Sequence, residues 1–462
     1  MSVLWTSAEI VEATGGSVHG DFEVSGVTFD SREVRPGDLF VAMPGTVHDG
    51  HEFVAGAIAA GAAGAIVSQP IDAPHVLVED TARALDALGR ASRERSKAKI
   101  IAVTGSVGKT STKEAIYAGL DRWRRGGVHR SVKSYNNHTG VPLSLARMPR
   151  DADYAVLELG MNNAGEIAAL TRMVRPHVAL ITAIAPAHIE NLKSEEAIAD
   201  AKAEIFEGLE PGGIAILPND SPHRDRLVKA ARRRTDRIVT FGRGDADVHA
   251  LHAVSSHGGG SLITASLLDC DLTFTISQPG DHWVSNALAA LAAVEAVGGD
   301  VAVAGLALAD MGALKGRGER HRVPLEGGEL LLIDESYNAN PASMAATLKS
   351  LGAETGVERR IAVLGPMREL GSHGDALHAG LAPAVIDAHV DRLVLIGEEM
   401  GPLADALEGQ VPVDRASGVD DAADILLKIA RPGDAVLVKA SNSIGLARLV
   451  ERVSGELQPC ST

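Results

Sequence analysis

Short apolar runs rich in β-branched residues alternate with longer stretches of helical spacing along most of this 462-residue chain. The two patterns predict strands at 154–159, 178–184, 213–217, 330–333, 360–364, 392–396 and 435–438, and helices at 166–173, 194–209 and 286–297. Strands that alternate with helices form parallel sheets covered on both faces, with binding sites at the carboxyl ends of the strands. The pattern therefore predicts an α/β fold.

Two interruptions of this alternation divide the chain. Residues 247–277 change to closely spaced strand-like pieces, which predict an antiparallel edge, and a glycine-bearing linker, G-A-L-K-G-R-G, follows at 312–318. A chain of this length accommodates about three domains. We predict domains at 1–95, 96–313 and 314–462.

Composition and charge narrow the classes of protein. The net charge of −16 argues against a general role on nucleic acids or membrane surfaces, which need basic patches. Only Cys270 and Cys460 occur, which excludes a disulfide scaffold and fits a reducing compartment. The N-terminus lacks a signal-peptide pattern, and no apolar segment reaches the roughly 18 residues that span a bilayer. A cytoplasmic protein without membrane insertion is expected.

The stretch 99–114, K-I-I-A-V-T-G-S-V-G-K-T-S-T-K-E, carries the clearest chemical signal. A β-branched run leads through small residues into a helix start, which is the order of a phosphate-binding loop. Backbone N–H groups of such a loop surround an anion, and the helix N-terminus adds partial positive charge. The spacing G-x-x-G-K-T is shorter than the general motif, because Val103 stands where the first glycine would be.

The loop residues expected to hold ATP are Gly105, Ser106, Val107, Gly108, Lys109, Thr110 and Ser111. Lys109 would reach the β- and γ-phosphates, and the Thr110 hydroxyl would ligate Mg²⁺. The competing interpretation is a strand-turn-helix junction with an incidental lysine.

Three more residues are candidates for the same site. Glu158 ends the first strong strand after the loop, where a Mg²⁺ ligand is expected. His188 follows the next strand, where it either contacts metal or phosphate or has a structural role. Lys202 shares a helix face with Ile198 and Ile205, so it is expected to be buried. A buried ammonium is costly unless paired, and carbamylation by CO₂ would turn it into an anionic ligand.

Two other stretches leave alternatives open. Ser31 and Arg32 lie in a loop that either holds a phosphate or uracil group or forms a local ion pair. The run L-L-L-I-D-E at 330–335 mimics the acidic strand end of a motor or transport ATPase, but it lies beyond an apparent domain boundary. A nucleotide-sugar sensor without turnover is a weaker alternative, because Lys109, Thr110 and Glu158 are all present.

Several longer motifs point to one family. The loop T-G-S-V-G-K-T is joined by E-L-G at 158–160, A-H at 187–188, the Lys202 helix and H-W-V-S-N-A-L-A-A at 282–290. More distinctive stretches are S-Y-N-N-H-T-G-V-P-L-S at 134–144, G-M-N-N-A-G-E-I at 160–167, A-K-A-E-I-F at 201–206 and D-E-S-Y-N-A-N-P-A-S-M at 334–344. Together, and over essentially the whole chain, they resemble the Mur ligases, the ATP-dependent amide-forming enzymes of peptidoglycan precursor synthesis.

The resemblance implies a monomeric enzyme of three domains. The first would bind a uridine nucleotide, the central phosphate-loop domain would bind ATP, and a Rossmann-like third domain would close over the site. The distinctive stretches are similar to those of members that join D-alanyl-D-alanine to a UDP-N-acetylmuramoyl-tripeptide through an acyl phosphate. A member that adds the preceding diamino acid is the alternative, and the last residue of the tripeptide, lysine or diaminopimelate, stays open.

The resemblance also assigns residues. Ser31 and Arg32 would bind the uridine nucleotide, and Asn136, Asn137, Thr139, Asn338 and Asn340 would bind substrate. ATP would contact Asn286, Arg320, Asp334, Tyr337 and Asn338. Thr110 and Glu158 would hold one Mg²⁺, while Glu158, His188 and a carbamylated Lys202 would hold a second. Glu335, Pro366 and Ala440 depart from the family's more usual Asp, Asp and Gly.

Overall fold

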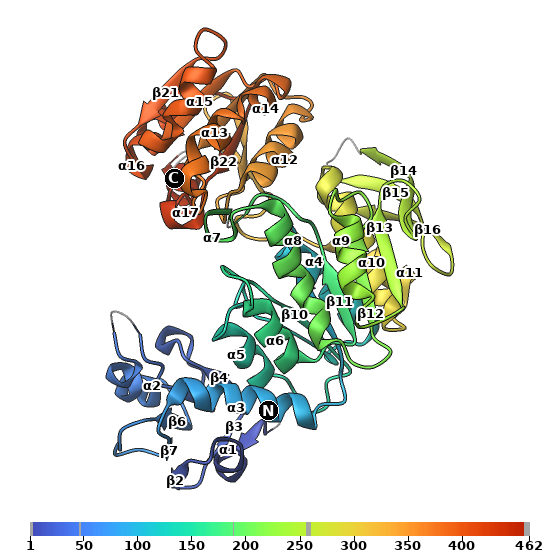
Figure 1. The fold of residues 1–462 in the computed structure, drawn as a ribbon. Helices are drawn as coiled ribbons and strands as arrows, with labels where there is room; N and C mark the ends of the chain where they lie inside the picture. Colours follow the sequence, from blue (N-terminus) through green and yellow to red (C-terminus); the bar gives the residue numbers. More distant parts are fainter. Residues whose placement is uncertain (1–2, 46–47, 188, 256–259, 457–462) are drawn as a thin grey trace.

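The computed structural model describes residues 3–45, 48–187, 189–255 and 260–456. Successive parts of the chain form separate sheets, which gives a three-domain α/β architecture (Figure 1). The N-terminal and C-terminal domains lie at opposite ends of the molecule, with the central domain between them (Figure 1). Within the described ranges, no helix combines the length and apolar character needed to cross a bilayer. The exact boundaries at 95/96 and 313/314 stay predictions.

The N-terminal domain contains a five-stranded sheet in the order β2-β7-β6-β5-β4, and β1 pairs separately with β3. Its elements are β1 (Trp5–Thr6), α1 (Ser7–Thr14), β2 (Ser17–His19), β3 (Glu23–Val24), β4 (Gly26–Thr28), β5 (Asp38–Val41), α2 (Val54–Ala59), β6 (Gly64–Val67), β7 (His75–Leu77) and α3 (Thr81–Arg95). The buried Trp5 side chain donates a hydrogen bond from Nε1 to Ala146 O at 2.9 Å. This contact fastens the first domain to the central one.

The central domain is built on a nine-stranded sheet in the order β16-β15-β14-β13-β12-β11-β8-β10-β9. Its elements are β8 (Lys99–Thr104), α4 (Lys109–Trp123), β9 (Val128–Arg130), α5 (Gly140–Ala146), β10 (Tyr154–Glu158), α6 (Glu166–Val174), β11 (Val178–Ile181), α7 (Ile189–Leu192), α8 (Glu195–Ala203), β12 (Ile214–Pro218), α9 (Arg224–Ala231), β13 (Ile238–Gly242), β14 (Val248–Ser255), β15 (Ser261–Ser266), β16 (Asp271–Ile276), α10 (Asp281–Ala296) and α11 (Val301–Asp310). The strands from β9 to β14 pair in parallel, whereas β14, β15 and β16 pair antiparallel. The predicted antiparallel edge is confirmed.

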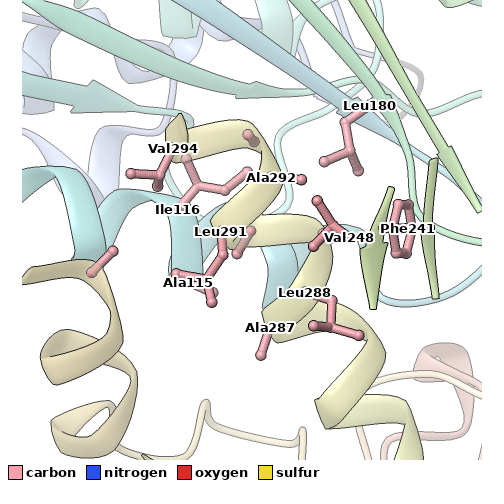
Figure 2. Packing of buried hydrophobic residues seen from close by; sticks show 14 of the residues in the cluster. Ala115, Ile116, Leu180, Phe241, Val248, Ala287, Leu288, Leu291, Ala292 and Val294 are labelled. Carbon is pink, nitrogen blue, oxygen red and sulfur yellow. The ribbon is translucent and has the colours of Figure 1, made fainter. Parts of the chain in front are cut away.

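Helix α10 shows how this domain fills its core without many aromatic residues. Leu288 and Leu291 of α10 belong to one buried cluster with Ile116 of α4 and with Leu180 and Phe241 of the sheet (Figure 2). Small alanine side chains between the leucines let the helix approach the sheet closely, so apolar contact is dense. Helix α10 also contacts the first turn of α4, directly after the phosphate loop, where Thr112 Oγ1 donates a hydrogen bond to Asn286 Oδ1 at 3.3 Å.

The C-terminal domain has a six-stranded sheet in the order β17-β18-β22-β19-β20-β21. Its elements are β17 (Glu319–Leu325), β18 (Gly328–Asp334), α12 (Pro341–Gly352), β19 (Arg359–Leu364), α13 (Gly374–Ala379), α14 (Ala382–Asp387), β20 (Arg392–Ile396), α15 (Gly401–Ala406), β21 (Val413–Ala416), α16 (Val419–Ile429), β22 (Asp434–Lys439) and α17 (Ala447–Glu456). All neighbours pair in parallel except β17 with β18. The four strands predicted for this region are confirmed, and β17 and β21 are additional.

Two predicted helices have different limits in the structure. The helix predicted at 286–297 begins earlier, at Asp281, and ends at Ala296. The helix predicted at 194–209 divides into α8 and a 3₁₀ segment at Glu204–Gly208. The change has a local cause, because the Glu204 carboxylate accepts N–H bonds from Gly165 and Ala168 at the start of α6. These bonds hold the end of α8 against α6.

Candidate active site

The phosphate loop joins β8, in the interior of the central sheet, to α4. Gly105 and Gly108 have φ values of 147° and 81°, which favour glycine. A Cβ on Gly105 would lie 2.0 Å from Thr182 Oγ1, and one on Gly108 would lie 2.6 Å from Asn286 Oδ1. The close approach of these neighbours explains why both positions are glycine and why the loop backbone can surround an anion.

Lys109, the first residue of α4, turns back over this loop. Its Nζ donates a hydrogen bond to Gly105 O at 2.8 Å. Burial lowers the pKa of Lys109, and the nearby negative charge of Glu158 opposes that shift. The ammonium therefore sits at the mouth of the loop with only a neutral carbonyl as hydrogen-bond acceptor among the described residues.

Glu158 and Thr110 lie together, as the sequence predicts. Glu158 is 1% exposed at the carboxyl end of β10, and its Oε2 accepts a hydrogen bond of 2.8 Å from Thr110 Oγ1. Its Oε1 accepts one of 2.7 Å from Asn136 Nδ2, and its backbone N–H donates to Ser131 Oγ at 2.9 Å. A hydroxyl and a carboxylate oxygen thus stand side by side next to the phosphate loop, and such hard oxygens suit Mg²⁺.

A cleft extends from this loop to the C-terminal domain. Its lining includes all the loop residues from Ser106 to Ser111 and, among the other predicted residues, Asn136, Asn137, Glu158, Asn286, Tyr337, Asn338 and Asn340. Across the cleft, Ser134 and Tyr337 contact each other through their hydroxyl groups, and the Arg317 guanidinium lies 4.0 Å over the Tyr337 ring. Residues predicted on two domains therefore face one space.

Lys439 and Glu335 also line the cleft, although neither was predicted as a site residue. Lys439 is 2% exposed, and its Nζ contacts Glu335 Oε2 at 3.3 Å and Asn338 O at 2.9 Å. Burial lowers the pKa of the Lys439 ammonium, while Glu335 raises it. Lys439 ends strand β22, so the strand-end rule that identified Glu158 was also a signal for Lys439.

Other predicted residues lie away from the cleft. Ser31 and Arg32 form a 3₁₀ turn in the first domain, where Arg32 binds both oxygens of Asp30 at 2.9 and 2.7 Å. This local ion pair lowers the pKa of Asp30 to about 2. The Thr139 hydroxyl donates to Asn137 Oδ1 rather than lining the cleft.

Two residues assigned to ATP have other surroundings. Arg320 lies in a smaller adjoining recess, where it binds both oxygens of Glu354 at 2.9 and 2.5 Å. Asp334 is buried, and its Oδ1 accepts the N–H of Ser336. The possible ligand atoms of Asp334, Glu319 and His321 lie within 4.8 Å of one another. These three side chains could therefore hold a metal ion, at a place separate from Thr110 and Glu158.

Lys202 is buried as predicted, with 1% of its surface exposed. Burial and the positive charge of Lys109 lower its pKa well below the usual value, against a smaller opposite effect of Glu204. In the part of the chain that the structure describes, no group accepts a hydrogen bond from its Nζ. His188, the other predicted ligand near this point, lies outside the described residues.

Sequence comparisons identify the same family in all three domains. The family descriptions that match are "Mur ligase family, catalytic domain" over residues 23–105, "Mur ligase middle domain" over 103–294 and "Mur ligase, glutamate ligase domain" over 316–442. The UDP-N-acetylmuramoyl-tripeptide–D-alanyl-D-alanine ligase of Synechocystis sp. is 34% identical over 447 residues, which cover 94% of this chain and 93% of the relative.

Solved structures agree with that result. A crystal structure of MurF from Acinetobacter baumannii matches with a TM-score of 0.84 and 30% sequence identity. The match covers 97% of this chain and 98% of the Acinetobacter chain. The MurF ligase from Thermotoga maritima in complex with ADP has a TM-score of 0.77 and 26% identity, covering 94% and 98% of the two chains. With its phosphate loop, its three domains and these relatives, the chain belongs to the Mur ligase family.

Proposed function

We propose that this chain is an ATP-dependent ligase that joins D-alanyl-D-alanine to a UDP-N-acetylmuramoyl-tripeptide and releases ADP and phosphate. The Synechocystis relative is named for that activity, and it matches this chain over nearly the full length of both proteins. The observation that carries the proposal is the cleft in which Lys109, Thr110 and Glu158 face polar groups of the C-terminal domain. Such a cleft brings a phosphate donor and an acceptor amine to one place.

The phosphate loop would hold the donor. Backbone N–H groups between Ser106 and Ser111 and the N-terminus of α4 favour the phosphates, and Lys109 neutralises charge on the transferred group. Thr110 and Glu158 fit Mg²⁺, because their oxygens are adjacent and Glu158 is held by Asn136. When bound, Mg²⁺ would offset the negative charge that separates the nucleotide from an incoming carboxylate.

The reaction then needs two bond exchanges. The terminal carboxylate of the tripeptide takes the γ-phosphoryl group from ATP, so that an acyl phosphate and ADP form. The amine of the dipeptide next bonds to the acyl carbon, the C–O bond to phosphate breaks, and the amine proton goes to solvent or a basic group. Asn338 and Asn340 would orient the dipeptide from the C-terminal side of the cleft, and Ser31 and Arg32 would anchor the uridine nucleotide in the first domain.

A phosphate-release assay tests this function. Release should require ATP, the UDP-linked tripeptide and D-alanyl-D-alanine together, and a comparison of lysine-ending and diaminopimelate-ending tripeptides would identify the natural substrate. Turnover with a single amino acid in place of the dipeptide would instead support the member that adds the diamino acid. Steady hydrolysis of ATP by the protein alone would support the motor or transport alternative. We further propose that the enzyme acts as a cytoplasmic monomer, and sedimentation analysis tests its mass.

Carbamylation of Lys202 is part of the same proposal. The lowered pKa of Lys202 favours its neutral amine, and a neutral amine adds CO₂ to give a carbamate with loss of one proton. The resulting anionic oxygens, with Glu158 and His188, would serve as ligands of a second Mg²⁺.

The carbamate can be detected without an activity assay. In buffer with ¹³C-bicarbonate, the native protein should give a carbamate carbon signal that Lys202→Arg removes. Lys113 provides a matched control, because it is also fully buried but donates to Ser131 O and Lys133 O at 2.9 and 2.7 Å. The signal should remain in Lys113→Arg, and a signal that survives Lys202→Arg contradicts the assignment.

A further inference from the structure

Lys113 is a buried charged side chain to which the proposed reaction gives no role. It lies on α4, one turn after Lys109, and none of its surface is exposed. It does not line the cleft, so it does not touch a ligand there. Burying an ammonium group costs free energy unless the group is paired, and an apolar side chain of similar length would avoid that cost. A lysine at this position therefore indicates that its hydrogen bonds have a use.

The Lys113 ammonium has an acceptor for each of its N–H groups. Its Nζ donates hydrogen bonds to Ser131 O at 2.9 Å and to Lys133 O at 2.7 Å, and it lies 3.0 Å from Glu114 Oε1. An ammonium group has three N–H donors, so these acceptors satisfy it completely. The two carbonyls belong to the backbone that follows β9. Lys113 thus fastens that backbone to α4.

The fastened segment, residues 131–136, contains no helix or strand. Within it, Lys133 has a φ of 54°, in the left-handed region that is disfavoured for a residue with a side chain. A backbone in such a conformation persists only where the surrounding structure holds it. One of the carbonyls that Lys113 holds is that of Lys133 itself, and the other lies two residues earlier.

The same segment supports Glu158 at its backbone and at its carboxylate. Ser131 Oγ accepts the Glu158 N–H at 2.9 Å, and Asn136 Nδ2 donates to Glu158 Oε1 at 2.7 Å. The other carboxylate oxygen contacts the hydroxyl of Thr110, which lies on α4 together with Lys113. Lys113 therefore connects the helix that carries Thr110 to the segment that supports Glu158.

We propose that Lys113 is a positioning residue that holds the Glu158 carboxylate at the right distance from the Thr110 hydroxyl for Mg²⁺. The assignment rests on the proposed function, which places Mg²⁺ at these two groups. Mg²⁺ demands nearly ideal octahedral geometry, so a small displacement of one ligand weakens its binding. A nucleotide without a metal ion depends on the phosphate loop alone, and Lys113 donates no hydrogen bond to that loop in the part of the chain that the structure describes.

Calorimetric binding of ADP, once with EDTA and once with excess Mg²⁺, tests the assignment without acyl substrates. Lys113→Met keeps the length of the side chain and removes its donors. With Mg²⁺ this variant should bind ADP about fivefold more weakly than the native protein, and with EDTA the affinity should change less than about twofold. Lys99→Met is the matched control and should change neither affinity. Lys99 also donates to a backbone carbonyl, Val297 O at 3.1 Å, but it begins β8, at the opposite end from the phosphate loop.

A second variant interrupts the same connection at its other end. Ser131→Ala removes the hydroxyl that accepts the Glu158 N–H and leaves the backbone carbonyl to Lys113. It should weaken ADP binding by a similar factor, again only with Mg²⁺. Combined with Lys113→Met it should add less than about twofold to the loss, because both changes release the same carboxylate. Unchanged binding with Mg²⁺ in Ser131→Ala overturns the assignment, even if Lys113→Met does not fold.

The other outcomes separate this inference from the proposed function. Equal losses with and without Mg²⁺ in Lys113→Met indicate a general structural role and overturn the inference, and so does an unchanged affinity in both conditions. Losses that add fully in the double variant overturn it as well, since they show two independent effects. A protein that shows the Mg²⁺-specific loss but never ligates overturns the proposed function alone.

Discussion

The two sheet edges that face each other across the cleft hold their charged side chains in different ways. On the central domain, Lys109 donates to the Gly105 carbonyl, and Glu158 accepts from Thr110 and Asn136. All of these partners are neutral. Among the described residues, no oppositely charged side chain therefore forms a hydrogen bond with the Lys109 ammonium or the Glu158 carboxylate.

The C-terminal edge pairs two of its cations with carboxylates of its own domain, while a third, Arg317, lies over the Tyr337 ring. Lys439 pairs with Glu335, and Arg320 pairs with Glu354 through two hydrogen bonds. These pairs present oriented donors and acceptors with little net charge. They suit a nucleoside or a zwitterionic dipeptide better than a polyphosphate.

The difference explains how a chain with a net charge of −16 can bind an anionic nucleotide. Attraction depends on the local, unneutralised cation Lys109 and on the loop backbone, not on the overall charge. The carboxylate of Glu158 would repel phosphate, and a bound divalent cation would offset that repulsion. The comparison predicts that changes on the central edge affect the reaction far more than changes on the C-terminal edge.

Replacing Lys109 should have the largest effect. Lys109→Ala removes the charge that faces the transferred phosphoryl group, so kcat should fall by at least about 10³-fold. Phosphate release at saturating substrates measures the loss, and an unchanged thermal unfolding curve serves as the control for folding. A kcat within about tenfold of the native value would contradict the claim that the charge of Lys109 dominates the reaction.

Replacing Glu158 should come next. Glu158→Gln keeps both hydrogen-bond partners in reach but removes the negative charge, so kcat should fall between about 10²- and 10³-fold. The Mg²⁺ concentration that gives half-maximal activity should rise at the same time. Glu166→Gln, at a carboxylate that also lines the cleft but binds Asn162 and Asn163, is the matched control. An unchanged Mg²⁺ requirement in Glu158→Gln argues against a metal site there.

The same two edges show what could be predicted from the sequence. Lys109, Thr110 and Glu158 were identified because each belongs to a short local motif or ends a strand, and a parallel sheet gathers strand ends. The burial of Lys202 followed from its place on an apolar helix face. These predictions depend only on residues that are close together in the sequence, so a single sequence is enough to make them.

Features that depend on contact between distant parts of the chain were missed. Lys439 and Glu335 pair within the C-terminal domain, but they lie 104 residues apart in the sequence, and no local pattern predicts that contact. Strand β17 was missed for another reason. Its sequence begins E-R-H-R, a polar run at a sheet edge that lacks the apolar signal of a buried strand.

The central edge should also be sensitive to acid. Burial lowers the pKa of His129 on β9 to about 4, and its Nε2 donates to Ser144 O at 2.7 Å. Between pH 6.5 and 4 the unfolded chain binds a proton at this histidine and the folded chain does not, so stability falls as the pH falls. The loss attributable to His129 should reach about 3 kcal/mol near pH 4 and be absent above about pH 6.5.

Urea unfolding at several pH values measures this effect. His129→Gln should flatten the decline of the unfolding free energy between pH 6.5 and 4, whereas His252→Gln, at an exposed histidine, should leave it unchanged. Because β9 leads into Ser131, which holds the backbone of Glu158, acid should loosen the central edge first. An equally steep decline in His129→Gln would show that other groups cause it.

The smallest effect is expected on the C-terminal edge, at Glu354. Its carboxylate orients the Arg320 guanidinium through both oxygens, and the guanidinium has further N–H groups that can face the recess. Glu354→Gln keeps one acceptor and loses the charge, so the KM for ATP should rise about fivefold while kcat changes less than about twofold. Glu451→Gln, which alters the exposed pair with Lys315, is the matched control. A lower KM in Glu354→Gln would mean that Glu354 competes with the nucleotide for Arg320, and the paired charges of this edge would then restrain binding instead of preparing it.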